Sequence, residues 1–511
     1  MANIRKQSIK GTIWVYFGFS IGALITYLFT HKSWFTPEQN GLARTILELG
    51  ILIAAFSAIG TNFYIYKLFP YYKDNLPNNK NDLLGTALKI SLIGFLIVSI
   101  SLWFLKPLII KKFGTNAPQL VNYFYIIIPI GFSYLMLTLL ESYAYGFKKA
   151  VTISFLKEVA IRIYTLALII LKIFNVINLD TFIYLFALQY FIVVAILGYI
   201  LYKENNLWIS FKTSYVTKKF KKNIINILLL TALTVVVTVL RGSIDILLLA
   251  SKRNLDNVAI MGFAYFLAIV MQAPMRTLIG VTIPILSTCW KEKNYAEINR
   301  IYKRTSINML AFALFIFFIV MLNYDAAVHF FNLNPSYLIG KNVFIILGIV
   351  NIIELGTGVN GQIIGTSSFF RFELWTSILL TALIIPLSYF LTDKYGVIGP
   401  AIANLASFTI YNTIRYIFLL KKFNMQPFSS KTVELIFIAL LAGSIVYYFF
   451  EGKEGLLFLI LRSILFCILF AVPVYLRNIS PDVKPVSPIF KCLFDFDCLK
   501  GSKANLMFNI D

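Results

Sequence analysis

Runs of apolar residues, separated by short polar segments, follow one another along almost the whole chain. Most runs hold about 20 residues, the length that an α-helix needs to cross the ~30 Å hydrocarbon layer of a membrane. The pattern therefore predicts an all-α polytopic membrane protein with about 14 transmembrane helices. The predicted spans cover residues 11–33, 41–68, 83–106, 119–145, 152–174, 180–202, 224–250, 257–286, 305–325, 341–365, 371–392, 396–420, 432–450 and 455–476.

A long basic segment interrupts this pattern near the middle of the chain and includes four lysines between residues 218 and 222. Six predicted spans precede this segment and eight follow it. In both halves the second span closes with a proline, at Pro70 and at Pro284. We therefore predict two pseudo-symmetric, parallel six-helix lobes, an arrangement found in many transporters, and two further helices. The predicted divisions are an N-terminal lobe at 1–203, a basic cytoplasmic connector at 204–223, a C-terminal lobe at 224–421, helices 13 and 14 at 431–476 and a cytoplasmic tail at 477–511.

Composition supports a membrane protein and argues against a nucleic-acid-binding protein. Of the 511 residues, 59% are hydrophobic and only 14% are charged, whereas a soluble domain has about 25% charged residues. A net charge of +23 would suggest a nucleic-acid partner in a soluble protein. Here Lys and Arg concentrate in alternate loops, as the positive-inside rule requires, so we expect no nucleic acid and place both termini in the cytoplasm.

Cysteine usage and phosphate-binding motifs predict no cofactor. Four cysteines are too few and too scattered to form a disulfide framework or a recognisable zinc site, and Cys492 and Cys498 have no histidine near them. No Gly-rich loop ending in Lys-Ser or Lys-Thr occurs in the sequence, so we expect no ATP hydrolysis by this chain. Transport of a substrate against its own concentration gradient would then use a H⁺ or Na⁺ gradient.

Four short motifs resemble the polysaccharide-export flippases, a family of the superfamily that also holds multidrug and toxin extrusion transporters and lipid-II flippases. They are Thr-Pro-Glu-Gln-Asn-Gly-Leu at residues 36–42, Ile-Asp at 244–245, Ile-Pro-Ile-Leu-Ser at 283–287 and Tyr-Gly-Val-Ile-Gly-Pro-Ala-Ile-Ala at 395–403. Pro400 stands where the family pattern usually has Ala. The motifs occur in the family order over about 400 residues, in a chain with about 14 predicted spans.

The resemblance implies a fold, a substrate class and a location. The fold would be a V-shaped pair of six-helix lobes around a central cavity, with two peripheral helices. The substrate would be a polyprenyl-diphosphate-linked oligosaccharide for surface polysaccharide such as O-antigen, lipopolysaccharide or capsule. It would move from the inner to the outer leaflet of a bacterial inner membrane by alternating access. We expect a monomer that contacts membrane lipids, with other polysaccharide-assembly proteins as candidate partners.

A diphosphate cannot cross hydrocarbon unless cations replace its water, and Arg is suited to this because its planar fork binds phosphate oxygens in pairs. Arg276 follows Pro274 and has no acidic residue within a turn, so it is the first candidate for a cavity cation. Arg44 and Arg462 are excluded, since both are expected near the outer interface. The predicted substrate-binding residues are Arg276, Arg241, Arg162, Lys89 and Lys157.

Acidic residues inside spans are expensive and therefore candidates for ion coupling. We select Asp245, Glu354 and Glu141. An alternative stays open for each: Asp245 lies four residues after Arg241 and could form a structural pair with it, as Glu158 could with Arg162. Glu354 lies in a Gly-rich span that could serve helix packing alone, and Glu141 lies near the inner interface.

Two other functions compete with a flippase for this sequence. An ion-coupled drug or cation exporter of the same fold would favour an acidic cavity, whereas the deep charges of this chain are mostly basic. A membrane enzyme such as a glycan polymerase would need a large outer loop, and the longest one, about residues 324–341, offers only Asp325 and His329.

The basic stretch 291–304 could form an amphipathic surface helix or an ordinary topology-setting loop.

Overall fold

The computed structural model describes residues 2–479, without the side chains of residues 2–13 and of Thr277. Within that range the secondary structure is helical, apart from one isolated bridge between His31 and Leu333. Most of the predicted tail, including Cys492 and Cys498, lies outside the described residues.

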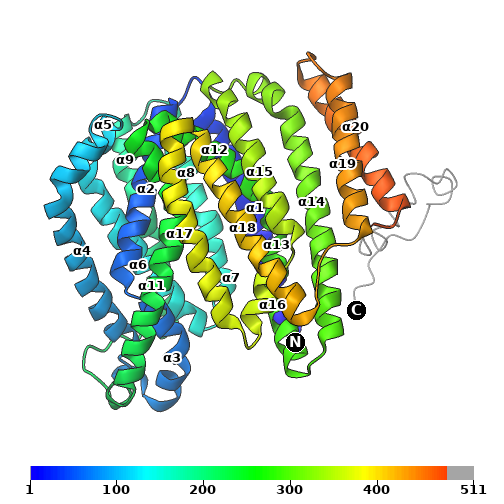
Figure 1. Cartoon of the computed structure of the whole chain (residues 1–511). Coiled ribbons are helices and arrows are strands. Elements are labelled where there is room, and N and C mark those ends of the chain that lie inside the picture. Colours follow the sequence, from blue (N-terminus) through cyan, green and yellow to red (C-terminus); the bar gives the residue numbers. More distant parts are fainter. Residues whose placement is uncertain (1, 480–511) are drawn as a thin grey trace, which may run out of the picture. The chain divides into compact units, whose positions relative to one another are not determined.

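The helices follow the sequence as drawn in Figure 1. Up to the connector they are α1 (Ala2–Thr30), α2 (Pro37–Ala58), α3 (Thr61–Asn75), η1 (Asn78–Lys80), α4 (Leu83–Phe113), α5 (Pro118–Asn122), η2 (Phe124–Ile126), α6 (Ile127–Gly146), α7 (Ala150–Phe155), the π-helical η3 (Leu156–Ala160), α8 (Ile161–Ile173), α9 (Leu179–Ala187) and α10 (Gln189–Lys203). After it they are α11 (Tyr215–Lys252), α12 (Leu255–Met271), α13 (Ala273–Lys291), α14 (Tyr295–Phe330), η4 (Pro335–Ile339), α15 (Gly340–Gly356), α16 (Asn360–Thr366), α17 (Phe370–Tyr395), α18 (Ile398–Phe423), α19 (Ser430–Phe449) and α20 (Leu456–Leu476).

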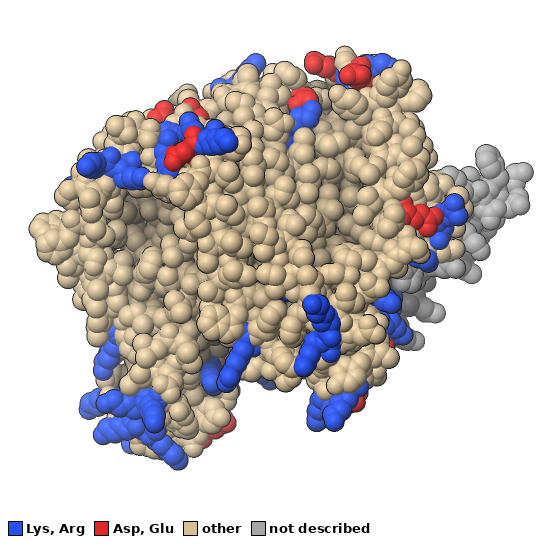
Figure 2. Space-filling model, in the orientation of Figure 1, with Lys and Arg blue, Asp and Glu red and all other residues tan. Residues whose placement is uncertain are grey.

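Every predicted span contains helix, but several spans are broken. Among the described residues, ten helices are long and apolar enough to cross a membrane, and the bent pair of α12 and α13 makes eleven. The second predicted span divides into α2 and α3 because Ile59 and Gly60 both adopt left-handed backbone conformations, with φ of 47° and 74°. On the face shown in Figure 2, charged side chains gather near helix ends and leave an uncharged belt between them. The chain is a multi-pass membrane protein.

Two basic segments predicted to connect spans are partly helical. Helix α11 begins at Tyr215, inside the predicted connector, and the Ser214 hydroxyl caps it by accepting a hydrogen bond from the Thr217 N–H. The buried Asp82 carboxylate accepts further bonds from the Ser214 N–H at 2.9 Å and the Thr217 hydroxyl at 2.7 Å. Residues 295–304 form the start of the 36-residue helix α14, so this part of 291–304 is helical rather than a loop and is continuous with the span that follows.

The chain forms two compact units that differ from the predicted lobes. Unit 1 comprises Met1–Phe266, Val328–Leu347 and Ser377–Ser407, and unit 2 comprises Leu267–Ala327, Gly348–Thr376 and Phe408–Asp511. The division into two six-helix lobes and a terminal helix pair remains a prediction.

Glycines allow the helices of unit 1 to pack closely. Helix α2 packs against both α4 and α6, and the three lie near one another in Figure 1. A Cβ atom at Gly50 would lie 2.3 Å from the Ile130 side chain, and one at Gly94 would lie 2.4 Å from the Ser57 carbonyl oxygen. Helix backbones approach this closely only at small residues.

The same argument gives a testable prediction for Gly41 at the start of α2. A Cβ atom there would lie 1.9 Å from the Leu255 carbonyl oxygen at the start of α12. Gly41→Ala should therefore destabilise the protein by about 1–3 kcal/mol, since two backbones must separate. Thermal unfolding in detergent measures the effect. The control is Gly242→Ala in α11, where nothing lies within 4 Å and where the loss of a flexible residue should leave stability unchanged or slightly raised.

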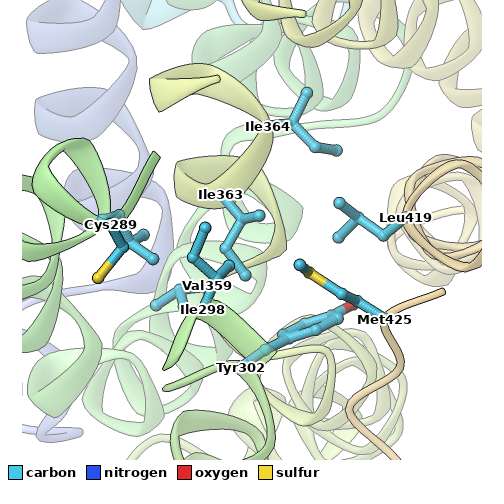
Figure 3. Packing of buried hydrophobic residues seen from close by; sticks show 9 residues of the cluster. Cys289, Ile298, Tyr302, Val359, Ile363, Ile364, Leu419 and Met425 are labelled. Atoms are coloured by element: carbon cyan, nitrogen blue, oxygen red, sulfur yellow. The ribbon is translucent and has the colours of Figure 1, made fainter. Parts of the chain in front are cut away.

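Unit 2 has an apolar core of its own, in which Leu286 and Cys289 of α13 pack against Ile298 and Tyr302 of α14. Val359, Ile363, Ile364, Leu419 and Met425 complete the cluster (Figure 3). The Trp290 indole N–H donates to the Ile363 carbonyl oxygen at 3.0 Å and so fixes α13 beside α16.

Candidate functional site

A buried carboxylate lies near the C-terminal end of α11. Asp245 is 2% exposed and accepts three hydrogen bonds from three other helices of unit 1. The donors are the Tyr265 hydroxyl of α12 at 2.5 Å, the Ser388 hydroxyl of α17 at 2.8 Å and the Asn404 amide of α18 at 2.7 Å. Within the described residues, Asp245 forms no ion pair. A buried carboxylate with only neutral partners is costly as an anion.

The pairing of Arg241 with Asp245, which their spacing allowed, is not formed. The Arg241 side chain is half-buried, and no ion pair or side-chain hydrogen bond holds it in the part of the chain that the structure describes. Asp245 is hydrogen-bonded instead to α12, α17 and α18. The side chains of Arg241 and Asp245 therefore have different environments, although they lie one helical turn apart. Arg241 therefore remains available to an anionic ligand.

A second polar cluster surrounds the break between α12 and α13 in unit 2. The two helices meet at Gln272 with a bend of 56°, and Pro274 lies in the first turn of α13. The Gln272 amide donates to the Asn351 Oδ1 atom at 2.7 Å and to the Glu354 Oε2 atom at 3.3 Å, both on α15. Asn351 in turn donates to the Ala268 carbonyl oxygen at 2.9 Å.

Arg276 lies one turn beyond this break. Its side chain is exposed, and its backbone N–H donates to the Gln272 carbonyl oxygen at 3.4 Å. The sequence-based expectation of a helix break beside Arg276 is confirmed. The first turn of α13 therefore carries an exposed cation beside the helix break.

Three of the predicted substrate-binding cations, Arg162, Lys157 and Lys89, contact identified protein groups. Arg162 pairs with Glu158 at 2.9 Å, the alternative that their four-residue spacing left open, and lies against the α1 glycines Gly18 and Gly22. Lys157 pairs with Glu141 of α6 at 3.0 Å, so the structure joins a predicted substrate cation to a predicted coupling acid.

Lys89 of α4 holds the connector. Its ammonium group donates to the Phe211 carbonyl oxygen and lies 5.6 Å from the centre of the Phe211 ring. The side chain is thus engaged with residues of the segment that links α10 to α11.

The Lys157–Glu141 pair gives a prediction that separates structure from transport. In a double-mutant cycle of Lys157→Met and Glu141→Gln, we expect a coupling energy of about 1 kcal/mol from thermal or denaturant unfolding. If the pair is structural, the double variant should keep the transport activity that the sequence leads us to expect of the wild type. The more exposed pair of Lys149 and Glu204 is the control and should show a smaller coupling. A double variant that is stable but inactive would assign this pair to transport.

Two arginines beyond the predicted set are buried and satisfied. Arg415 of α18 pairs with Glu373 of α17 and lies 3.8 Å from the centre of the Tyr411 ring. Arg462, which we expected to reach the interface, is only 8% exposed and donates to three carbonyl oxygens, including that of Leu322 at 2.7 Å. That expectation for Arg462 is therefore wrong.

Comparison with solved structures identifies the fold. A structure described as "Lipid II flippase MurJ, inward closed conformation" has a TM-score of 0.74 and 14% identity, over 92% of this chain and 99% of that one. The chain has the MurJ and MATE fold. A MATE-family multidrug resistance transporter of the MOP superfamily, in an inward-facing conformation, has a TM-score of 0.59 and 15% identity over 79% of this chain and 96% of its own.

The Vibrio cholerae MATE transporter VcmN, in its bent form, has a TM-score of 0.51 and 16% identity over 83% and 98% of the two chains. Neither a protein-family model nor a curated protein matches this sequence. Since the identities are so low, the likeness concerns the fold alone.

Sequence reasoning missed the three donors to Asp245. Tyr265, Ser388 and Asn404 lie on three different spans, and nothing in their local sequence marks them as partners of one carboxylate. Gln272 and Asn351 were also missed, although their place beside a predicted helix break and in the span of Glu354 is a usable signal.

Proposed function

We propose that this protein is a flippase that moves a polyprenyl-diphosphate-linked oligosaccharide from the cytoplasmic to the outer leaflet of a bacterial inner membrane. The protein would be a monomer with the two predicted six-helix lobes and would work by alternating access. Its transport would serve the synthesis of surface polysaccharide such as O-antigen or capsule. Other proteins of polysaccharide assembly are candidate partners.

The extent of the structural likeness supports a flippase over an exporter. The likeness to the lipid II flippase covers 92% of this chain with a TM-score of 0.74, whereas the two MATE transporters cover 79% and 83% with scores of 0.59 and 0.51. A lipid II flippase is by its name a carrier of a lipid-linked substrate, and the motifs of the sequence point to the same class.

Two arginines are the proposed contacts of the anionic part of the substrate. Arg276 has an exposed side chain at the start of α13, and Arg241 has a half-buried side chain that no protein group of the described chain pairs with. Charge-assisted bonds from Arg to phosphate oxygens are about twice as strong as neutral ones. Arg162, Lys157 and Lys89 are weaker candidates than Arg241, since a substrate would have to displace their protein partners.

Asp245 is the proposed coupling site. Its carboxylate is buried and its three hydrogen-bond donors are neutral. The hydroxyl oxygens of Tyr265 and Ser388 are ligands that a hard cation such as Na⁺ accepts. A cation that binds there removes the cost of the buried charge and thereby favours one conformation over another. Glu354 is a second candidate because it shares the polar cluster of the α12–α13 break.

Complementation tests the proposal. The gene is expressed in a bacterial strain that lacks its own oligosaccharide flippase, and surface glycan is measured by immunoblotting for several glycan types. We expect restored surface glycan and no change in resistance to cationic drugs. Drug resistance without restored glycan would favour an exporter and overturn the proposal.

A further inference from the structure

An apolar cavity of about 200 Å³ lies in unit 1 between α2 and the outer half of α4. On the face shown in Figure 2 the surface is hollowed beside α4. All the lining side chains are hydrocarbon. They are Leu49, Leu52, Ile53 and Phe56 of α2, Val98, Leu102, Ile109 and Phe113 of α4, and Leu120, Phe124 and Ile127 of the segment that follows.

The cavity follows from the path of α4. At Gly94 this helix touches the Ser57 carbonyl oxygen of α2 so closely that no side chain fits between them. Further along α4, Val98, Leu102, Ile109 and Phe113 line the open space. The back wall is rigid, since α2 and α6 are locked together at Gly50 and Gly131.

Water cannot occupy such a space well. A buried water molecule needs two to four polar partners, and no lining side chain offers one. An empty void of this size would forfeit the dispersion contacts of its walls. Apolar protein cavities of about 150 Å³ take up small hydrocarbons, and this cavity is larger and lies in a membrane-spanning bundle, where hydrocarbon chains are the solvent.

A cation marks one edge of the cavity. Lys106 lies on α4 between the lining residues Leu102 and Ile109, and its ammonium group lies 2.5 Å from the Tyr125 hydroxyl. It also lies 6.0 Å from the centre of the ring of Phe124, another lining residue. Lys111 and Lys112 follow on exposed positions at the end of the helix. Across the described chain, none of these three lysines forms an ion pair.

We propose that this cavity binds one chain of an anionic membrane phospholipid, with the phosphate of its head group at Lys106 and the Tyr125 hydroxyl. The lysines supply positive charge without acidic partners, and a head group at the end of α4 would lie in the outer leaflet in the predicted orientation. The lipid is distinct from the transported substrate. The proposal rests on the placement of the helices in a membrane and is independent of the proposed function.

Native mass spectrometry of the purified full-length protein tests this. The protein is extracted in mild detergent and incubated with phosphatidylglycerol or with phosphatidylcholine of the same chains, and the retained lipid is counted. We expect the wild type to retain phosphatidylglycerol. Leu102→Trp, which fills the cavity, should lose it. Ile100→Trp, on the exposed side of the same helix, should retain it.

The head-group contact has its own variant. Lys106→Gln should lower the preference for phosphatidylglycerol over phosphatidylcholine by about fivefold, since one basic residue near anionic lipid contributes about 1 kcal/mol. Lys303→Gln, an exposed lysine at the start of α14, is the control and should not change the preference. If Leu102→Trp does not fold, Val98→Phe replaces it, because this substitution fills less of the same cavity. Thermal unfolding shows whether each variant is folded.

Three results would overturn the proposal. The first is equal retention of phosphatidylglycerol by the wild type and the filled variants. The second is an unchanged head-group preference in Lys106→Gln. The third is displacement of the phospholipid by polyprenyl phosphate at equal concentration, which would assign the cavity to an isoprenoid chain.

Discussion

Asp245→Asn is expected to abolish ion-driven transport while the protein still folds. The substitution keeps the size of the side chain beside Tyr265, Ser388 and Asn404 but removes the charge that would bind a proton or Na⁺. Moving one charge through a membrane potential of 100 mV supplies about 2.3 kcal/mol, so losing that coupled charge should lower the attainable accumulation roughly 50-fold. The measurement is transport of a lipid-linked glycan in proteoliposomes, with and without an imposed H⁺ or Na⁺ gradient.

The matched control for this variant is Asp393→Asn. Asp393 lies near the end of the same α17 that carries Ser388, but it is 58% exposed and pairs with Lys252 at 2.5 Å. Its loss should leave the ion dependence intact. Ser388→Ala should have an intermediate effect, because it removes one of three hydrogen bonds to Asp245 and keeps the charge. Wild-type transport with unchanged ion dependence in Asp245→Asn would show that the carboxylate is structural.

Arg276→Ala is expected to express normally and to fail to restore surface glycan. A hydrogen bond to a charged group contributes about 1.5–3 kcal/mol, so substrate affinity should fall roughly 10- to 150-fold. Arg276→Lys should restore transport only in part, since Lys keeps the charge but cannot bind two phosphate oxygens at once. The measurement is surface glycan in the complemented strain, normalised to the amount of protein in the membrane.

Two further arginines make this experiment specific. Arg300→Ala removes an exposed cation that pairs with Glu297 at 2.9 Å, and it should have no effect on transport. Arg241→Ala ranks the second candidate against Arg276. If Arg276→Ala and Arg241→Ala both transport as well as the wild type, neither arginine binds the substrate, although the fold remains as described.

The two pairs with a spacing of four residues show how far sequence reasoning reaches. Glu158 and Arg162 form the ion pair that their spacing allows, and Arg241 and Asp245 do not. In both pairs the four-residue spacing places the two side chains on the same face of a helix. What differs is the competition from other helices: three neutral donors meet Asp245 from distant parts of the chain, and their positions depend on packing.

The apolar pattern by itself determined that the chain is helical and crosses a membrane many times. These properties follow from local rules, since every backbone group in hydrocarbon must be satisfied within its own helix and the length of each apolar run sets the length of each span. The motif resemblance pointed to the fold that the structural comparison then identified. The break beside Arg276 was also readable, because Pro274 acts on its own helix.

Only the tertiary structure decided which charged groups meet. It joined Lys157 to Glu141, directed Lys89 to the connector, buried Arg462 among carbonyl oxygens and assembled the partners of Asp245 from α12, α17 and α18. It also opened the cavity beside α4, which depends on the contact of Gly94 with Ser57 and that of Gly50 with Ile130, partners 37 and 80 residues apart in the sequence. Such contacts depend on how helices pack, and close packing is set by the summed shapes of many side chains, which no single stretch of sequence contains.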